Sequence, residues 1–553
     1  MTNKQRLVLS RASSVFHSTG RLVMSVLVVV AVLLFGAGPV MAGPTPDSTL
    51  KVCPSGCPYS EIAPALAVAK SGDTIKLAAG TYAGGVTIAA SVNLVGAGSA
   101  STIIRGGGPV LTIGTFGASG GPTVSIQGVT ITGGVTRSSP QSASFTGEEG
   151  VLALGGGVEI PPNADFTGGA TVTISNSAIT GNRVAPTHAL PLGPPCPDGP
   201  CPFAGAAGGG IDTWGKLTLA NTTVTGNLVG SASGLSTVAS DAEGGAIKNW
   251  LNDLTISNTT ISGNRASATA PNGRFADAGG VFVQGGGLTM SNSLVMNNTA
   301  TLNASLPKGV DMLAIAGGIH IGGGASAAIR TTTISDNSAS MTNTSGDAIA
   351  FSGGVHTDVS FELSDDVIAN NRVTSAALPG SSGNAFGDSG AGEMSGKISN
   401  TRFTGNSVTV RSAAADAIAS AGAAIFAGSM TNSVVSGNQV HGSSPHGSVF
   451  VAGGGLQAGD AGITLRSTTV SGNVGDARGL TGSAQGGGIF DVAVPDGPPG
   501  GPLVLTNSTV TRNVLTGGAA VTLQGGGVFA RNPVTLTHSV IAGNTPDQCD
   551  GCR

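Results

Sequence analysis

The chain has 553 residues, of which 40% are apolar, 10% are charged and 91 are glycine. Its formal net charge of −4 is too close to neutral to favour nucleic acid or an anionic membrane as a partner. The glycines recur in phased clusters among apolar residues, which favours a repeat protein over a disordered chain.

Residues 1–42 have the layout of a secretory signal peptide. Four basic residues precede an apolar run at 22–35, and Val40 and Ala42 are small residues ahead of a cleavage site at Gly43. The alternative is an uncleaved anchor, because 22–42 is barely long enough to span a bilayer. We expect a secreted or cell-surface protein, with the membrane as a partner only if this segment is retained.

Residues 43–73 are expected to form a linker and a capping helix. Within "YSEIAPALAVAKSGD" (59–73), Ile62, Leu66 and Ala69 lie at helical spacing, and Gly72 ends the pattern. The first strands follow at 74–98, so the helix is placed to cover an open sheet edge. Residues 545–553 are expected to form the cap at the other end.

Residues 74–544 repeat the phrase "GGGI…LTLxNSTVTGN". Each phrase predicts three short strands with polar corners, and the remainder of each repeat, rich in Ala, Ser, Gly and Pro, predicts a variable loop. One repeat then forms one rung of a parallel β-helix with three sheets and about a dozen rungs. The corner asparagine is expected to adopt a left-handed backbone and to bond its equivalent in the next rung. It recurs at Asn182, Asn227, Asn264, Asn298, Asn337, Asn371, Asn406, Asn438, Asn473, Asn513 and Asn544.

The chain resembles right-handed parallel β-helix proteins of the pectin-lyase-like superfamily. The resemblance rests on the helix followed by "SGDTIKLAAGTY" and "LVGAG", and "GGAI" (244–247) with the closing "GN" is similar to repeats of polymorphic outer-membrane proteins. It implies an all-β, single-domain fold. Because the superfamily holds lyases, hydrolases and adhesins, it implies no particular activity, and no catalytic residue is carried over.

The cysteines predict three local disulfides in an exported chain. A four-cysteine zinc site built from the two terminal pairs is the alternative, which the separation of the chain ends disfavours. The pairs are Cys53 with Cys57, Cys196 with Cys201, and Cys549 with Cys552.

Four repeats place an acid or an amide at the same position before the glycine corner: Asp311, Asp347, Asn384 and Asp416. These residues suit a calcium ion, which prefers oxygen ligands. A carboxyl pair for glycoside cleavage and a row of solvated loop edges are the two alternatives. The one Asp–Asp pair, Asp365 with Asp366, is interpreted as a solvated corner.

Residues that follow the inward apolar residue of each rung should form an outward column. His320 and His356 would be neighbours in this column, where stacked imidazoles suit a metal or acid–base chemistry, although repeat drift alone also explains them. Residues 390–394 do not align with the other rungs. The column is expected to hold Glu159, Asp212, Lys248, Phe282, His320, His356, Phe426, Gln457, Phe490 and Phe529.

The two tryptophans of the chain, Trp214 and Trp250, end the phrases "GGGIDTW" and "GGAIKNW". The phrase predicts that both indoles point outward and stack about 5 Å apart, the strand spacing. With Asp212 and Lys248 beside them, they would form a platform for a sugar ring. The alternative is a small satellite core beneath the loop at 184–204.

These features predict an exported structural or binding module for polysaccharide or a cell-surface glycan. A polysaccharide lyase or glycoside hydrolase is the second interpretation, and an adhesin for a protein partner is the third. We expect a monomer that binds no nucleic acid, with calcium as the one candidate cofactor.

Overall fold

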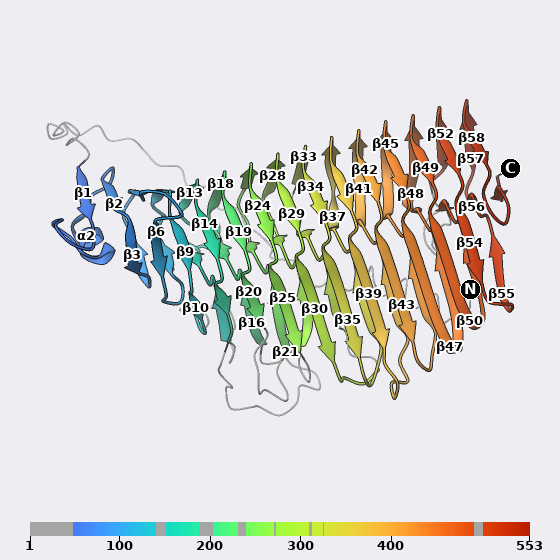
Figure 1. The fold of residues 1–553 in the computed structure, drawn as a ribbon, viewed down its shortest axis with the longest axis horizontal. Coiled ribbons are helices and arrows are strands. Elements are labelled where there is room, and N and C mark those ends of the chain that lie inside the picture. Colours follow the sequence, from blue (N-terminus) through green and yellow to red (C-terminus); the bar gives the residue numbers. More distant parts are fainter. Residues whose placement is uncertain are drawn as a thin grey trace, which may run out of the picture.

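Parallel strands stack along one long axis, with the helix α2 (Ile62–Val68) near the N-terminal end of the stack and β58 near the other (Figure 1). The structure is a computed structural model that describes residues 48–139, 151–186, 203–230, 239–269, 273–308, 312–324, 326–491 and 501–552. The predicted signal peptide, 1–42, lies outside the described residues.

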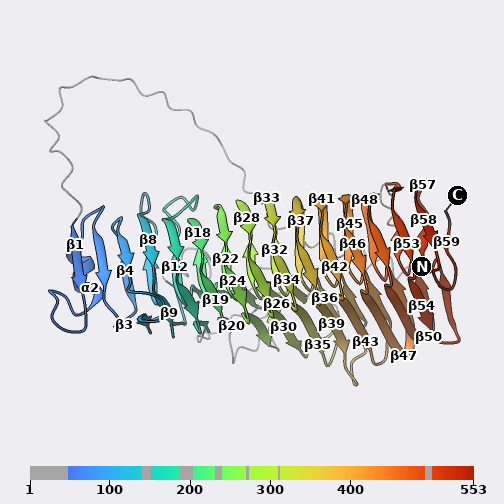
Figure 2. The ribbon, with the colours of Figure 1, turned by 45° about the horizontal axis from the view of Figure 1, so that its top comes forward.

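A typical turn in the middle of the body consists of five short strands joined by tight corners, and in later turns neighbouring strands merge into one. In one turn these are β22 (Ile247–Asn249), β23 (Leu254–Ser257), β24 (Thr260–Ser262), β25 (Arg265–Thr269) and β26 (Gly273–Asp277). β22 and β23 belong to a sheet of 25 strands, β24 to one of 14, and β25 and β26 to one of 20. Every strand pairs in parallel with its counterpart in the next turn (Figure 2). The chain is therefore a right-handed parallel β-helix with three sheets, as predicted.

Two stacks of strands flank the glycine corner at which each turn begins. The stack before the corner includes β11 (Val151–Leu154), β16 (Phe203–Ala207), β21 (Ala239–Glu243), β26, β31 (Leu313–Ile315), β36 (Ala348–Phe351), β40 (Ala385–Asp388) and β44 (Ala417–Ser420). The stack after the corner includes β12 (Val158–Ile160), β17 (Ile211–Thr213), β22, β27 (Val281–Val283), β32 (Ile319–Ile321), β37 (Val355–Ser364), β41 (Gly392–Ser399), β45 (Ala424–Thr431) and β48 (Leu456–Arg466).

The third sheet corrects one expectation, because it is built largely from residues that were expected to form loops. In β25 and β26 the inward side chains are Ala266, Ala268 and Ala276, all fully buried. Alanine, serine and glycine are weak strand formers, so their composition indicated loops. The same small residues pack closely once neighbouring rungs pair, and tertiary pairing overrides their propensity.

The interior is a continuous apolar core. The inward residues that follow the glycine corner, among them Ile211, Ile247, Val281, Ile319 and Val355, are fully buried and stack as a column. A single rung exposes this apolar edge, so burial of the column against neighbouring rungs stabilises the stack.

Eleven corner asparagines form a buried hydrogen-bonded ladder, close to the dozen rungs expected. In the first ten, the side-chain amide Nδ2 donates to Oδ1 of the next asparagine at 2.8–3.0 Å, and the last, Asn544, donates to Gln548 Oε1 at 3.2 Å. The left-handed backbone belongs to the preceding residue, such as Gly181 (φ 64°) or Asn297 (φ 56°), and not to the ladder asparagine. The expected hydrogen bond is confirmed, and the expected backbone conformation is wrong by one position.

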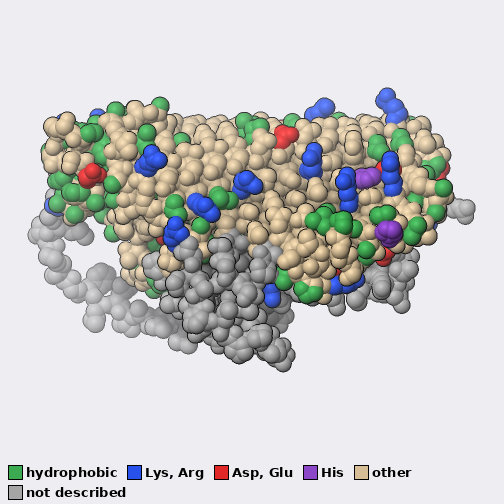
Figure 3. All heavy atoms as spheres, turned by 60° about the horizontal axis from the view of Figure 1, so that its bottom comes forward, with side chains coloured by type: hydrophobic (Ala, Val, Ile, Leu, Met, Phe, Trp, Pro, Cys, Tyr) green, Lys and Arg blue, Asp and Glu red, His purple; other side chains and the backbone are tan. Residues whose placement is uncertain are grey.

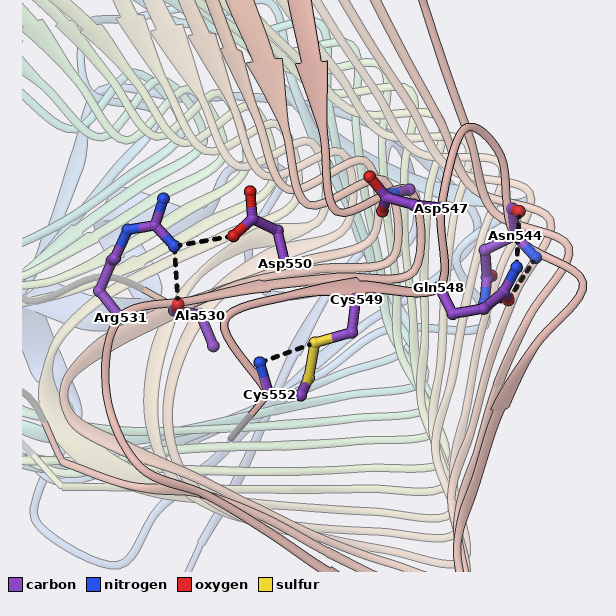
Figure 4. Close-up of a disulfide and its surroundings, with 9 residues drawn as sticks. Ala530, Arg531, Asn544, Asp547, Gln548, Cys549, Asp550 and Cys552 are labelled. Carbon is purple, nitrogen blue, oxygen red and sulfur yellow. Dashed lines mark hydrogen bonds and ion pairs between the residues drawn. A yellow bond between two sulfur atoms is a disulfide. The ribbon is translucent and has the colours of Figure 1, made fainter.

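The two ends of the body carry the two disulfides found in the described residues, Cys53–Cys57 and Cys549–Cys552. At the C-terminal end, Arg531 contacts Asp550 at 3.2 Å beside the Cys549–Cys552 bond (Figure 4). At the other end the helix α2 lies beside β1 (Thr49–Val52), with Ile62 and Ala65 buried. Its role as a cap stays a prediction. The third predicted pair, Cys196 and Cys201, lies outside the described residues.

Removal of the Cys549–Cys552 disulfide is expected to change global stability little, because the bond closes a loop of very few residues. The measurement is thermal unfolding of a variant with both cysteines replaced by serine. Mass mapping of non-reduced peptides should also show Cys196 bonded to Cys201. A pairing between any two of the three cysteine pairs would contradict this assignment.

The described surface is mostly uncharged. Lys and Arg side chains are spread singly over the face shown in Figure 3. No helix in the described ranges is both long and apolar enough to cross a membrane.

Candidate functional site

The outward side chains of the two strand stacks that flank the glycine corner contact one another along the corner, a strip that we call the trough. The corner needs glycine: Gly244 has φ 63°, and a Cβ there would lie 2.5 Å from the Ile247 carbonyl oxygen. The tight bend brings Lys248 of β22 against Glu243 of β21, with Nζ and Oε2 2.7 Å apart. The trough therefore combines side chains from two sheets.

The two indoles stack at one end of the trough, as the register predicts. The ring centroids of Trp214 and Trp250 are 4.9 Å apart, and the ring planes differ by 12°. Trp214 is 5% exposed, and Trp250 is half-buried. The Trp250 Nε1 donates to Asp212 Oδ1 at 3.0 Å.

The indole faces are covered, which argues against the flat sugar platform. Phe166 lies edge-on to Trp214 with centroids 5.9 Å apart, and Lys248 Nζ lies 4.2 Å from the Trp250 ring centroid. Because successive rungs are spaced at the stacking distance of aromatic rings, the indoles present their edges outward. The Trp214 side is covered by the segment around Phe166, whereas most of the 184–204 loop lies outside the described residues.

Asp212 and Lys248 are both fully buried, and both contact the Trp250 indole. Lys248 Nζ donates to Glu243 Oε2 and to Gln284 Oε1, each at 2.7 Å, and lies 3.4 Å from the Phe282 ring centroid. Burial raises the pKa of Asp212 well above its ordinary value. Because both side chains are buried, their contact with a sugar stays a prediction without geometric support.

A pocket of about 310 Å³ opens beside the indoles. Its apolar lining consists of Leu152, Leu154, Ala207 and the two tryptophans. Asp241 and Glu243 continue the columns of Leu152 and Leu154 in a later rung, and Gln284 follows the tryptophans in the next rung, so polar groups lie at one end of the pocket. Burial raises the pKa of Asp241 well above its ordinary value, and the charge of Glu243 raises it further. The pocket offers both an apolar surface and directional polar groups.

His320 and His356 lie farther along the trough, in adjacent rungs as predicted. Their centroids are 4.8 Å apart at an interplanar angle of 80°, so the rings meet edge to face and are not stacked as expected. His320 instead stacks on Phe282, with centroids 4.5 Å apart. A third residue, Asp358, joins both imidazoles: its Oδ2 is 3.9 Å from His320 Nε2, and its Oδ1 is 3.5 Å from His356 Nε2.

The Nδ1 atom of each imidazole has a polar side-chain partner within hydrogen-bond distance. Both oxygens of Asp277 lie 2.8 Å from His320 Nδ1, and Ser352 Oγ lies 3.0 Å from His356 Nδ1. Burial alone lowers the pKa of His320, but Asp277 and Asp358 outweigh it and raise the pKa to about 9. Burial alone raises the pKa of Asp358, but the two histidines outweigh it and hold that pKa below its ordinary value.

The residues of the predicted oxygen ladder align in consecutive rungs, but their side-chain oxygens accept hydrogen bonds from backbone N–H groups. Asp347 Oδ1 accepts from the Asn384 amide at 2.7 Å, and Asn384 Oδ1 accepts from the Asp416 amide at 3.2 Å. Asp416 Oδ1 in turn accepts from Ser448 N–H at 3.0 Å. These bonds account for the ladder without a cation, so the calcium site stays a prediction with no geometric support. Asp311 lies outside the described residues.

Two further expectations are wrong. Asp366, interpreted as a solvated corner, is 1% exposed, and its Oδ1 accepts from Thr332 N–H at 2.7 Å. In the outward column, Glu393 pairs with His356 and Ile425 pairs with Glu393, so the fully buried Phe426 points inward. The expectation failed because Ala424, and not Ile425, occupies the inward position in the rung of Phe426.

A scan against protein-family models and a search of curated proteins each give no match. Among solved structures, a polygalacturonase from Erwinia carotovora ssp. carotovora is similar at 12% identity, over 89% of this chain and 99% of that chain, with a TM-score of 0.22. So distant a likeness carries no argument about activity. On its three parallel sheets, the chain is a right-handed parallel β-helix.

Proposed function

We propose that the protein is exported and binds a polysaccharide or cell-surface glycan in the trough, with one sugar unit in the pocket beside the indoles. The observation that carries this proposal is the pocket itself. Its apolar side chains suit the C–H side of a sugar, and the acid and amide groups that follow in the next rungs suit hydroxyls. Its volume of about 310 Å³ is at the lower end for small-molecule sites.

The polar end of the pocket is fixed in place before any ligand arrives. Lys248 Nζ binds both Glu243 and Gln284, so these two side chains are held in one geometry. A preorganised pocket lowers the entropic cost of binding. The disulfides at both ends of the body support an oxidising, extracytoplasmic location.

Filling the pocket should abolish glycan binding. Gly205 lines it, and its partners across the sheet are Leu152 and Asp241, so the strand accepts larger side chains at this position. Gly205→Leu is therefore expected to fold and to lose at least about tenfold in affinity, equivalent to 1.4 kcal/mol. Isothermal titration with a panel of neutral and acidic oligosaccharides measures the effect.

Ser483→Leu is the matched control, because Ser483 occupies the same outward column far along the trough. It should bind like the wild type. Either of two results would overturn the proposal: no oligosaccharide of the panel binds the wild type, or Gly205→Leu binds the best ligand unchanged.

Cleavage of the bound glycan is the second candidate, and the raised pKa of Asp241, which lines the pocket, favours it. A general acid must hold its proton at the working pH. If the protein is a hydrolase, Asp241→Asn should bind the oligosaccharide and release no new reducing ends. Equal reducing-end release by both proteins would remove Asp241 from this role.

A further inference from the structure

Three donor atoms converge at the middle of the trough. His320 Nε2, His356 Nε2 and one carboxylate oxygen of Asp358 all lie within 4.8 Å of one another. Both histidines are almost fully buried, whereas the Asp358 side chain is 34% exposed. In the described part of the chain, His320 Nε2 makes no hydrogen bond, and Asp358 at 3.9 Å is its ion-pair partner.

We propose that His320, His356 and Asp358 bind a first-row divalent transition-metal ion, with zinc as the expected occupant. A tetrahedral zinc ion with bonds of about 2.0–2.1 Å holds its ligand atoms roughly 3.4 Å apart. The two histidine-to-carboxylate distances, 3.9 and 3.5 Å, are close to that separation. Small side-chain rotations complete the site.

The surroundings of the histidines match those of metal ligands. Metal-bound histidine commonly uses its second ring nitrogen to bond a carboxylate or another polar group, which fixes the tautomer and orients the ring. Asp277 does this for His320, and Ser352 does it for His356. Both Nδ1 atoms are thereby engaged, and both Nε2 atoms face Asp358.

Gly322 keeps the approach to the donor atoms open. A Cβ at this position would lie 3.3 Å from both His320 Nε2 and Asp358 Oδ2. With three protein ligands and this open side, the ion keeps a position for water or for a ligand in the trough, which is the arrangement of catalytic zinc sites. Glu393, 3.8 Å from His356 Nδ1, adds to the local negative charge that favours a dication.

The donor set selects the class of metal. Imidazole nitrogens suit zinc, iron, copper and nickel, whereas calcium and magnesium prefer oxygen ligands. This site therefore differs in position and in metal from the calcium site suggested by the acid ladder. It also stands independently of glycan binding.

The test is titration of the chelator-treated full-length protein, its free thiols alkylated, with Zn²⁺ by calorimetry and with Co²⁺ by visible absorption. We expect one ion per chain. Asp358→Ser and His356→Gln should each weaken binding by about 100-fold or more through loss of a ligand. Asp277→Asn, which removes only a positioning residue, should weaken it by about 10–100-fold.

The stack already accepts glutamine at the position of His356, since Gln457 lies in the same column. Asp358 lies in the irregular stretch between His356 and Ser360, where its partly exposed side chain leaves room for serine. Circular-dichroism melts without metal check that the variants fold. The control is His441→Gln: His441 pairs with Asp476 at 2.8 Å on another face, and its loss should leave binding unchanged. A wild type that binds neither ion, or a double variant His356→Gln/Asp358→Ser that binds both as tightly, would overturn the proposal.

Discussion

Replacing Asn337 by alanine is expected to lower the free energy of unfolding by at least about 4 kcal/mol, because four buried hydrogen bonds lose a partner at about 1–3 kcal/mol each. Asn337 Oδ1 accepts from both the backbone amide and Nδ2 of Asn298, each at 3.0 Å. Asn337 Nδ2 donates to the Val295 carbonyl at 2.9 Å and to Asn371 Oδ1 at 3.0 Å. All of these groups are fully buried, so water cannot replace the lost bonds.

Denaturant unfolding of wild type and variant measures this loss. Asn303→Ala is the matched control, because Asn303 is exposed and its side chain bonds only Thr342 among the described residues. The control should change stability by less than about 0.5 kcal/mol. A loss below about 1 kcal/mol for Asn337→Ala would contradict a stabilising role for the ladder.

Replacing Asp366 by serine is expected to stabilise the protein above pH 7 and to have its smallest benefit near pH 4. Burial raises the pKa of Asp366 to about 7 in the folded chain. Its neighbours in the same buried ladder are hydroxyls: Thr332 accepts from Ser293 N–H, and Ser433 accepts from Thr401 N–H. A serine can accept from Thr332 N–H in the same way without a charge.

The direction of the pH dependence follows from the raised pKa. An unfolded aspartate loses its proton near pH 3.9, whereas folded Asp366 keeps its proton until about pH 7. Between these values the folded state binds the extra proton, so wild-type stability falls as pH rises and levels off above pH 7. About 3 pH units at 1.36 kcal/mol per unit mean that the stability of the variant relative to the wild type rises by about 4 kcal/mol between pH 4 and pH 7.

Unfolding measured at pH 4.5 and pH 8 tests this difference. Asp365→Asn is the control, because Asp365 is exposed at φ 61° and the left-handed Asn258 and Asn400 end the equivalent strands of other rungs. It should keep most of the wild-type pH dependence, because burial raises the pKa of Asp366 more than the charge of Asp365 does. A stability difference between Asp366→Ser and wild type that stays constant with pH would show that folding does not raise the pKa of Asp366.

The repeat phrase predicted most of the fold because each rung obeys the same local rules. The inward column headed by Ile211 and Ile247, and the hydrogen bonds between corner asparagines, follow from the phrase alone. The third sheet did not follow, because Ala266 and Ala268 favour strands only after neighbouring rungs have paired. Local propensity carries no information about such pairing.

The site was predictable only where its residues come from one stack of equivalent strands. The register placed Trp214 beside Trp250 and His320 beside His356. Asp358 was missed, although it lies two residues after His356 on the same outward face, which was an available signal. Asp277 could not be found in this way, because it reaches His320 across the glycine corner from a strand of another sheet.

The most direct test of the account is a crystal structure of the protein with its tightest-binding oligosaccharide. The account predicts electron density for a sugar unit in the pocket, against the edges of Trp214 and Trp250 and within hydrogen-bond distance of Glu243 or Gln284. Sugar density elsewhere on the surface, with none in the pocket or the trough, would contradict it.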